Sequence, residues 1–184
     1  MQASRNTVSR RRALQAGLSA GAAIAVPTII PSSALGLDGA VPPSERIIVG
    51  GIGIGRRGEY DLGCFLEQSD VTFAAIADVK EGRRQAVKKI ADTKYGTDNC
   101  TMHRDFREVL DRKDIDAVLI ATGPNWHGLM AMLAAKAGKD IYCEKPCTKN
   151  IAETLIHRDT MRRCGTVFQA VSYTHLRAHE TEAD

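Results

Sequence analysis

From residue 46 onwards, short apolar runs alternate with longer segments in which apolar residues recur at helical spacing. The runs are bounded by glycine, aspartate and other polar residues. Their near-continuous apolar character is typical of strands that are buried on both faces. The strands expected from these runs are Arg46–Ile52, Val71–Ala77, Cys100–Met102, Ile115–Ala121, Asp140–Cys143 and Thr166–Ala170.

The segments between these runs are predicted to be helices. Two of them are followed by Gly138 and Gly165, and glycine commonly ends a helix because it adopts the left-handed conformation. Asn150, with Glu153 three residues later, is typical of a capping box at the start of a helix. One segment, Glu81–Thr93, places its apolar residues on one face: Ala86, Val87, Ile90 and Ala91. The other expected helices are Glu59–Gln68, Asp105–Asp111, Trp126–Ala137 and the segment from Asn150 to Cys164.

This alternation of strands and helices predicts an α/β fold. Because a crossover helix is needed between parallel strands, the pattern indicates a doubly wound parallel sheet of the Rossmann type, formed by residues 46–170. No internal repeat is visible. The length of 184 residues, with 43% hydrophobic and 26% charged residues, fits one globular domain of ordinary composition.

The charge distribution gives no reason to expect a nucleic-acid partner. The net charge is +3, and three of the positive charges lie together at Arg10, Arg11 and Arg12. Without these three arginines, the positive and negative charges of the chain nearly cancel. No basic stripe with interleaved aromatic residues is present.

The cysteines do not predict a metal site. There are five of them, an odd number, and they lack the closely spaced pairs of structural zinc sites. We therefore expect no bound metal and interpret the cysteines as buried apolar thiols.

The first 34 residues resemble an export signal rather than part of the fold. A polar segment ends in Arg10–Arg12, an apolar run follows, and Ser32, Ser33 and Ala34 supply the small residues that a signal peptidase requires. The paired arginines are typical of a twin-arginine signal, although Ala13 stands where that motif usually has Phe. A membrane anchor is the alternative, but the run is shorter than the roughly 20 residues of a membrane span. We expect export to the periplasm, no other membrane association, and a linker at 35–45.

A glycine-rich sequence follows the first expected strand. Gly53, Gly55 and Gly58 fit the GxGxxG pattern, with Ile54, Arg56 and Arg57 between them, and the context of strand, loop and helix is that of a dinucleotide site. The first glycine permits a tight turn, the second lets the backbone approach a diphosphate, and the third allows close packing of helix and strand. The diphosphate is then expected at the helix N-terminus.

Asp78 closes the second expected strand, about 20 residues beyond the loop, where a carboxylate binds the adenosine ribose. It would repel a 2′-phosphate, which favours NAD. The nearby Arg83 and Arg84 could accommodate that phosphate, so NADP stays open. A helix N-cap is the alternative role for Asp78.

Two further segments carry a family resemblance. Residues 121–127 read Ala-Thr-Gly-Pro-Asn-Trp-His, and residues 138–146 end in Glu144, Lys145 and Pro146. With the glycine loop, they resemble the Gfo/Idh/MocA oxidoreductases, the family of glucose–fructose oxidoreductase and inositol dehydrogenase. The resemblance covers about residues 46–170. It implies an NAD(P)-dependent enzyme that transfers hydride between nicotinamide and a sugar or polyol hydroxyl.

The resemblance also implies roles for individual residues. Lys145 is expected to be catalytic, contacting the substrate hydroxyl and exchanging a proton. His127 is expected either to contact cofactor or substrate or to cap the following helix. Glu144 and Pro146, the latter expected to follow a cis peptide bond, would shape the cofactor side. The loop expected to pass the ribose and nicotinamide comprises Ala121, Thr122, Pro124 and Asn125, where Asn125 replaces the family's usual acidic residue.

Members of this family continue into a second α/β domain that supplies the substrate pocket, which is missing here. Residues 171–184 do not resemble the family and look non-native. The fragment is therefore expected to be inactive alone, and the whole enzyme to be a homo-oligomer. An NAD-dependent glycoside hydrolase of the same family and a non-catalytic dinucleotide-binding domain are the alternatives.

Overall fold

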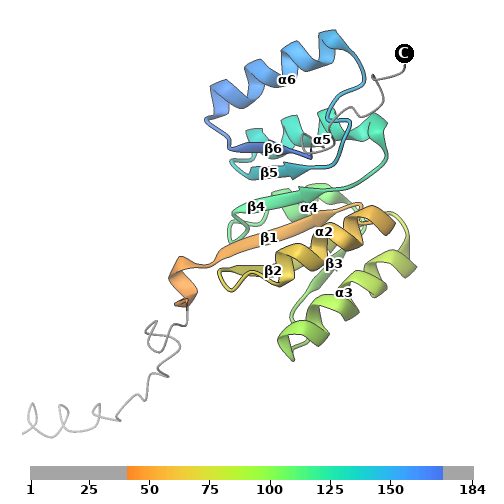
Figure 1. The fold of residues 1–184 in the computed structure, drawn as a ribbon, viewed down its shortest axis with the longest axis vertical. Coiled ribbons are helices and arrows are strands. Elements are labelled where there is room, and N and C mark those ends of the chain that lie inside the picture. The colour runs from red at the N-terminus through yellow and green to blue at the C-terminus, as the bar shows by residue number, and fades with distance from the viewer. Residues whose placement is uncertain (1–40, 172–184) are drawn as a thin grey trace, which may run out of the picture.

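The computed structural model describes residues 41–171, which form one parallel sheet with helices on both sides (Figure 1). The strand order is β3-β2-β1-β4-β5-β6, and every neighbouring pair is parallel. The predicted Rossmann-type fold is therefore confirmed. The strands are β1 (Ile47–Ile52), β2 (Val71–Ala77), β3 (Thr101–His103), β4 (Ala117–Ile120), β5 (Asp140–Cys143) and β6 (Phe168–Ala170).

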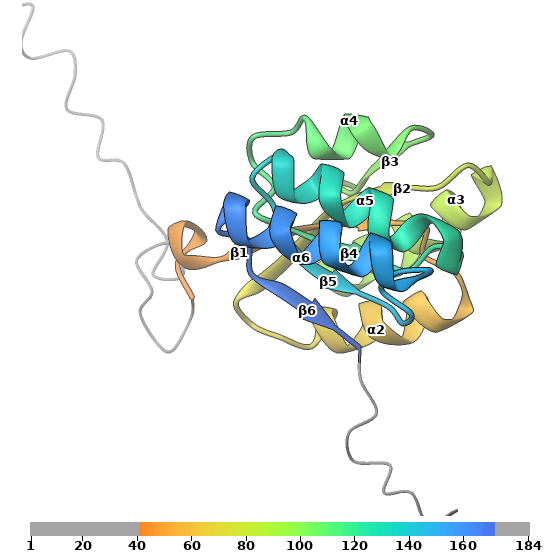
Figure 2. The ribbon, with the colours of Figure 1, turned by 90° about the horizontal axis from the view of Figure 1, so that it is seen from above.

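The helices divide between the two faces of the sheet, and each face has its own apolar core. Helices α2 and α3 pack on one face, around Phe73, and α4, α5 and α6 pack on the other, around Ile120. Figure 2 shows α4 and α5 on one side of the strands and α2 on the opposite side. The helices are η3 (Pro43–Glu45, a 3-10 turn), α2 (Arg56–Leu66), α3 (Glu81–Tyr95), α4 (Phe106–Leu110), α5 (Pro124–Lys136) and α6 (Ile151–Cys164).

Two helices begin earlier than the apolar pattern predicts. Helix α2 starts at Arg56 rather than Glu59, so the end of the glycine loop forms its first turn. Helix α5 starts at Pro124 rather than Trp126, because the fixed φ angle of proline suits the first helical position. Proline also lacks an N–H group, and an N–H at this position would make no hydrogen bond within the helix. Apolar periodicity does not register a first turn made of polar residues, glycine or proline.

The expected apolar face of α3 is only half buried. Val87 and Ala91 are fully buried against the sheet, but Ala86 and Ile90 are exposed. The buried pair is spaced by four residues and so lies in one row along the helix. Ala86 and Ile90 lie one position round the helix, where nothing covers them because α3 packs at the edge of the sheet.

Local signals at the ends of α6 and α5 are confirmed, with one change. Asn150 caps α6 by accepting a hydrogen bond from the Glu153 N–H at 2.9 Å, and Gly138 and Gly165 have φ values of 74° and 67°. The return bond of the capping box is shifted by one residue, since the Glu153 carboxylate accepts from the N–H of Lys149.

The prediction of buried thiols is correct for two of the five cysteines. Cys100 and Cys143 lie in the cores, whereas Cys64 and Cys164 are exposed and Cys147 is half-buried. The exposed pair lies on helices, where one face is open to water, whereas the sheet is covered on both sides.

Some expectations fall on residues outside the described range. The expected signal peptide and the first part of the linker precede residue 41, and residues 172–184 lie beyond the other limit. The described part of the linker contains η3, and Val171 still extends the sheet by donating to the carbonyl of Cys143 at 2.9 Å. Within residues 41–171, no helix is both long and apolar enough to cross a lipid bilayer.

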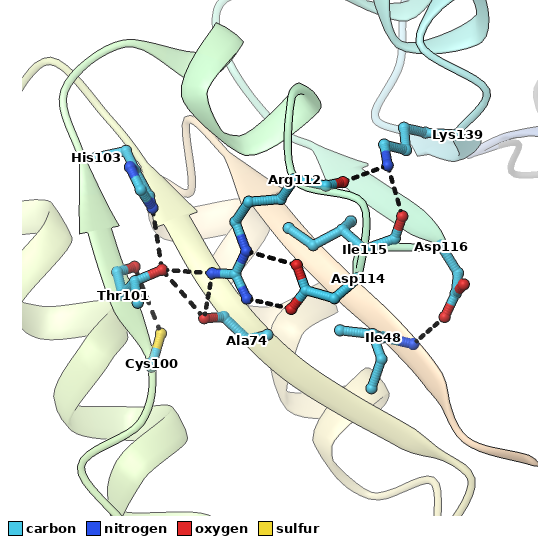
Figure 3. Close-up of polar contacts among 10 residues, drawn as sticks. All are labelled: Ile48, Ala74, Cys100, Thr101, His103, Arg112, Asp114, Ile115, Asp116 and Lys139. Carbon is cyan, nitrogen blue, oxygen red and sulfur yellow. Dashed lines mark hydrogen bonds and ion pairs between the residues drawn. The ribbon is translucent and has the colours of Figure 1, made fainter. Parts of the chain in front are cut away.

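A polar network fixes the strands near their amino ends (Figure 3). The guanidinium of Arg112 makes two parallel contacts with the Asp114 carboxylate, at 3.0 and 2.6 Å. A third nitrogen, Nη1, donates to the hydroxyl of Thr101 at 2.6 Å and to the carbonyl of Ala74 at 3.3 Å. Arg112 therefore joins β2 and β3 to the segment that precedes β4.

Lys139 completes this network from the start of β5. Its ammonium is buried and donates to the carbonyls of Arg112 and Ile115 at 2.6 and 2.7 Å (Figure 3). Beside it, the Asp116 carboxylate accepts from the N–H of Ile48 at 2.8 Å. These contacts satisfy polar groups at the sheet edge opposite to the carboxyl ends of the strands, so they serve the fold.

Replacing Lys139 by methionine should lower the free energy of unfolding by about 2 kcal/mol, because it leaves two buried carbonyl oxygens without a donor. Urea denaturation of the 184-residue chain measures this loss. Lys89→Met is the matched control, since Lys89 is exposed on α3. Equal stability of the two variants would contradict a structural role for Lys139.

Candidate functional site

The candidate site lies where the strand order changes direction. Successive strands are added on one side of β1 as far as β3, and the chain then returns to place β4 on the other side of β1. In open α/β sheets, ligands bind in the crevice at this point, outside the carboxyl ends of the strands. The glycine loop after β1, Asp78 after β2, the loop after β4 and the Glu144–Pro146 segment after β5 all lie at this edge (Figure 1).

The turn after β1 has no room for a side chain at Gly53 or Gly58. Gly53 has φ = 67°, and a Cβ atom there would collide with the methyl group of Thr122. A Cβ at Gly58 would lie 2.7 Å from that of Ala121 and 3.3 Å from the Ile54 side chain. Glycine at these two positions is what allows β1, α2 and the loop after β4 to approach one another.

Helix α2 begins without a side-chain cap. Its N-cap residue is Gly55, which has no side chain that could accept a hydrogen bond from the first turn. A helix start of this kind binds anions, because free N–H groups and the helix dipole both point towards them. The glycine turn and the uncapped helix therefore fit the diphosphate of a dinucleotide.

Ile54 contributes only its backbone to this loop. Its side chain is completely buried in the core beneath α2. The expectation that Ile54 binds cofactor therefore cannot apply to its side chain, because the middle position of the Gly-x-Gly turn points into the protein.

A cavity of about 830 Å³ opens beside the loop. Its volume is in the range of small-molecule and cofactor sites. Among the predicted residues, Gly53, Asp78 and Thr122 line it, and so does Arg83. The structure adds lining residues that sequence analysis did not assign: Val79, the segment 104–108, Gly123, Trp126 and Met130.

Trp126 is the most informative of these additions. It is the single tryptophan of the chain, it is 54% exposed, and it lies in the first turn of α5 at the cavity. Sequence analysis assigned it no role at the site. Its place directly after the fourth strand, at the same edge as the glycine loop, was the signal that could have revealed it.

Asp78 is buried and partly occupied by protein contacts. Its Oδ1 accepts a hydrogen bond from the N–H of Lys80 at 2.8 Å, and its Oδ2 lies 3.9 Å from Nη1 of Arg83. The N-cap of α3 is Lys80, so Asp78 does not cap that helix. Arg84 donates instead to the backbone carbonyl of Asp78 at 2.6 Å. Asp78 thus lines the cavity with one oxygen bonded to Lys80 and the other near a half-exposed arginine.

Arg57 does not extend towards the anion site. Its Nε donates to the Glu144 carboxylate at 2.7 Å, and its Nη2 lies 3.3 Å from Oδ1 of Asp61. Its guanidinium also stacks over the ring of Tyr60 at 4.7 Å. Arg57 therefore links α2 to the segment after β5. Arg56, the other arginine of the loop, is exposed in the first turn of α2.

Glu144 is held on both oxygens. The second oxygen, Oε2, accepts from the backbone N–H of Lys145 at 2.9 Å. Burial raises the pKa of Glu144, but the hydrogen bonds from Arg57 and from Lys145 outweigh it and the pKa is lowered. Glu144 is thus ionised and anchors the start of the segment. Lys145 is exposed at the sheet edge, and the Lys145–Pro146 bond is cis, as expected.

His127 bridges two loops from a buried position. Its Nδ1 lies 2.8 Å from the carbonyl oxygen of Pro146, and its Nε2 lies 2.9 Å from that of Thr122. The side chain is 1% exposed. Because both ring nitrogens face backbone oxygens, neither is available to a substrate, and the ring does not cap α5. We reinterpret His127 as a positioning residue that ties the loop after β4 to the Lys145 segment.

The remaining predicted residues share the loop that His127 holds. Ala121 and Thr122 are half-buried beneath the glycine turn, and Pro124 and Asn125 are exposed in the first turn of α5. This loop separates the cavity from the Glu144–Pro146 segment, so the predicted cofactor residues occupy one continuous edge of the sheet.

Comparisons with known proteins agree with this geometry. The family model of the Gfo/Idh/MocA oxidoreductases, described as having an NAD-binding Rossmann fold, matches residues 47–172. A myo-inositol 2-dehydrogenase of Thermotoga maritima is 32% identical over 105 residues, which cover 57% of this chain and 30% of that protein. An α-N-acetylgalactosaminidase of Shewanella oneidensis is 32% identical over 137 residues, covering 72% and 30%.

Solved structures of other proteins also have this fold. An NAD-binding oxidoreductase from Klebsiella pneumoniae has a TM-score of 0.56 at 27% identity, covering 68% of this chain and 34% of that one. An NAD-binding protein from Listeria innocua has a TM-score of 0.59 at 26% identity, covering 68% and 35%. The chain thus spans about a third of the length of these proteins. Since the family model matches more than half of the chain, the chain belongs to the Gfo/Idh/MocA oxidoreductase family and carries its NAD-binding Rossmann domain.

Proposed function

We propose that the chain is the cofactor-binding part of an enzyme that oxidises a sugar or polyol hydroxyl with NAD. The observation that carries the proposal is that the uncapped start of α2, the cavity and Lys145 lie at one edge of the sheet. The relative named myo-inositol 2-dehydrogenase supports a polyol as the substrate class.

Different residues would bind different parts of the cofactor. The N–H groups of the first turn of α2 would hold the diphosphate, and the free side of Asp78 would accept hydrogen bonds from the adenosine ribose. When bound, the nicotinamide ring supplies the acceptor for a hydride. The loop from Ala121 to Asn125 would lie along the ribose and nicotinamide, held in place by His127 through Thr122.

Lys145 would accept and return the proton of the substrate hydroxyl. Oxidation of an alcohol removes a hydride from carbon and a proton from oxygen, and the amine of Lys145 accepts that proton in its unprotonated form. In the reverse direction, its ammonium returns the proton to the carbonyl oxygen. A positive group at this point also stabilises the negative charge that develops on the substrate oxygen.

The chain spans about a third of the length of its relatives, and we propose that the substrate pocket lies in the remainder of the whole enzyme, so that the chain alone binds cofactor without catalysing turnover. We further propose that the whole enzyme is a homo-oligomer and that residues 1–34 direct its export to the periplasm by the twin-arginine route. Export in the folded state suits an enzyme that is loaded with cofactor before it crosses the membrane.

A second candidate is an NAD-dependent glycoside hydrolase, favoured by the match to the α-N-acetylgalactosaminidase over 72% of the chain. The cofactor domain would be used in the same way, but the hydride would return within each turnover. Net NADH would then not accumulate, which separates the two candidates. A non-catalytic binding domain is the third candidate, and the presence of Lys145 between Glu144 and Pro146 argues against it.

Gly55→Asp should weaken NAD binding by about tenfold or more, because its carboxylate would cap α2 and repel the diphosphate. The fold should survive, since a Cβ at Gly55 meets only the tip of Arg83 at 3.4 Å. Quenching of Trp126 fluorescence and calorimetry would measure binding to the 184-residue chain. Gly63→Asp adds the same charge further along α2, where a Cβ has open space, and should bind as the unmodified chain does.

Asp78→Asn should shift the preference between cofactors by about tenfold towards NADP, because it removes a negative charge from the place of the 2′-phosphate. The ratio of the two dissociation constants is the measurement. Asp70→Asn is the control, since Asp70 is exposed just before β2 at the opposite edge of the sheet. An unchanged ratio in Asp78→Asn would remove the basis for choosing NAD.

Lys145→Ala in the full-length enzyme should lower kcat with a polyol by about 100-fold or more, while NAD affinity changes little, because the proton would lose its acceptor. Accumulation of NADH is the assay, and Lys149→Ala, on an exposed neighbour, is the control. Full activity of Lys145→Ala would contradict its catalytic role. Glycoside cleavage without net NADH would favour the hydrolase.

A further inference from the structure

Two carboxyl groups meet behind the Lys145 segment. Asp61 lies on the inner face of α2 and Glu144 directly follows β5, and Arg57 contacts both through one guanidinium. The two side chains are only 4% and 5% exposed. A single guanidinium is therefore shared between two buried carboxyl groups.

The contacts of the two groups differ. Both oxygens of Glu144 accept hydrogen bonds, from Arg57 and from the Lys145 N–H. Asp61 has its Oδ1 near Arg57, but its Oδ2 is buried without any hydrogen-bond partner. A buried carboxylate oxygen with no donor is costly, whereas the oxygen of a protonated carboxyl can itself donate a hydrogen bond.

The surroundings make a second negative charge unfavourable. The charged group that acts on both carboxyls is Arg57 from α2, and Tyr142 from β5 is close enough for the charges of Asp61 and Glu144 to raise its own pKa. Tyr142 packs its ring edge-on against Phe65 with centroids 5.3 Å apart, so an apolar wall closes one side. Two carboxylates at close range in such a setting cannot both ionise without strong repulsion.

We propose that, in mildly acidic solution, Asp61 carries a proton that it shares with Glu144, and that this pair together with Arg57 then holds the Lys145 segment against helix α2. The helix that would bind the diphosphate then also positions the lysine that would exchange a proton. Asp61 is thus a positioning residue, and that consequence for catalysis rests on the proposed function. The shared proton itself does not.

The effect on stability has a defined sign. Burial, followed by the hydrogen bond and charge of Glu144, raises the pKa of Asp61 from 3.8 to about 6. Between these values the folded chain binds more protons than the unfolded chain, so this contribution is complete below about pH 4 and is lost as the pH rises through 6. At neutral pH, ionised Asp61 lowers the stability of the fold.

Asp61→Asn tests this in the 184-residue chain. Asparagine has the same shape, is always neutral and can donate to Glu144, so Tm at pH 7.5 should rise by about 3 °C or more. The gain should shrink by about half or more at pH 4.5, where Asp61 itself is protonated. If Asp61 were instead the charged partner of Arg57, Asp61→Asn would lower Tm at pH 7.5, and that result would overturn the proposal.

A spectroscopic measurement locates the proton independently of stability. At pH 5.5, the infrared difference between the unmodified chain and Asp61→Asn should contain the carbonyl stretch of a protonated carboxyl. Its absence would contradict the assignment to Asp61. Glu67→Gln, on an exposed residue just after α2, should leave both the stretch and the pH dependence of Tm unchanged. None of these results depends on NAD, whose binding the Gly55→Asp variant tests separately.

Discussion

The close approach of backbone at the turn between β1 and α2 is the constraint on which the site depends. Gly53 and Gly58 leave no space for a Cβ because Thr122 and Ala121 already occupy it. Strand β1 pairs with both β2 and β4, so the position of this turn relates the two halves of the sheet to each other. A larger side chain at either glycine would separate α2, which we propose binds the diphosphate, from the loop that borders the cavity.

Two sets of contacts connect that turn to the segment that carries Lys145. From the face of α2, Arg57, which also contacts Asp61, donates to Glu144, and from the opposite face His127 contacts the carbonyl of Pro146. The segment is thus fixed on both sides of the sheet by residues that do not line the cavity. Such support keeps a reacting group in place better than a free loop does, because its neighbours lock its geometry.

The sequence was sufficient to predict the order of elements and the edge at which the site lies, because apolar runs and the glycine pattern are local signals. It was insufficient for contacts between distant segments. Arg57 reaches Glu144 across 87 residues, and no spacing rule relates the two. His127 and Ile54 were misjudged for a related reason. A motif gives the position of a residue in the chain, but the packing of neighbouring loops decides whether its side chain faces the cavity or the protein interior.

Our proposal of NAD rather than NADP rests on the weak ion pair of Asp78. One of its oxygens is committed to the N–H of Lys80, and the other is 3.9 Å from Arg83, which is 47% exposed. An ion pair that long and that accessible to water contributes little, so a ribose hydroxyl can replace it at small cost. A 2′-phosphate would instead bring its charge against a buried carboxylate. Arg83 could offset part of that repulsion only by leaving Asp78, and this is the reason why we propose NAD as the cofactor.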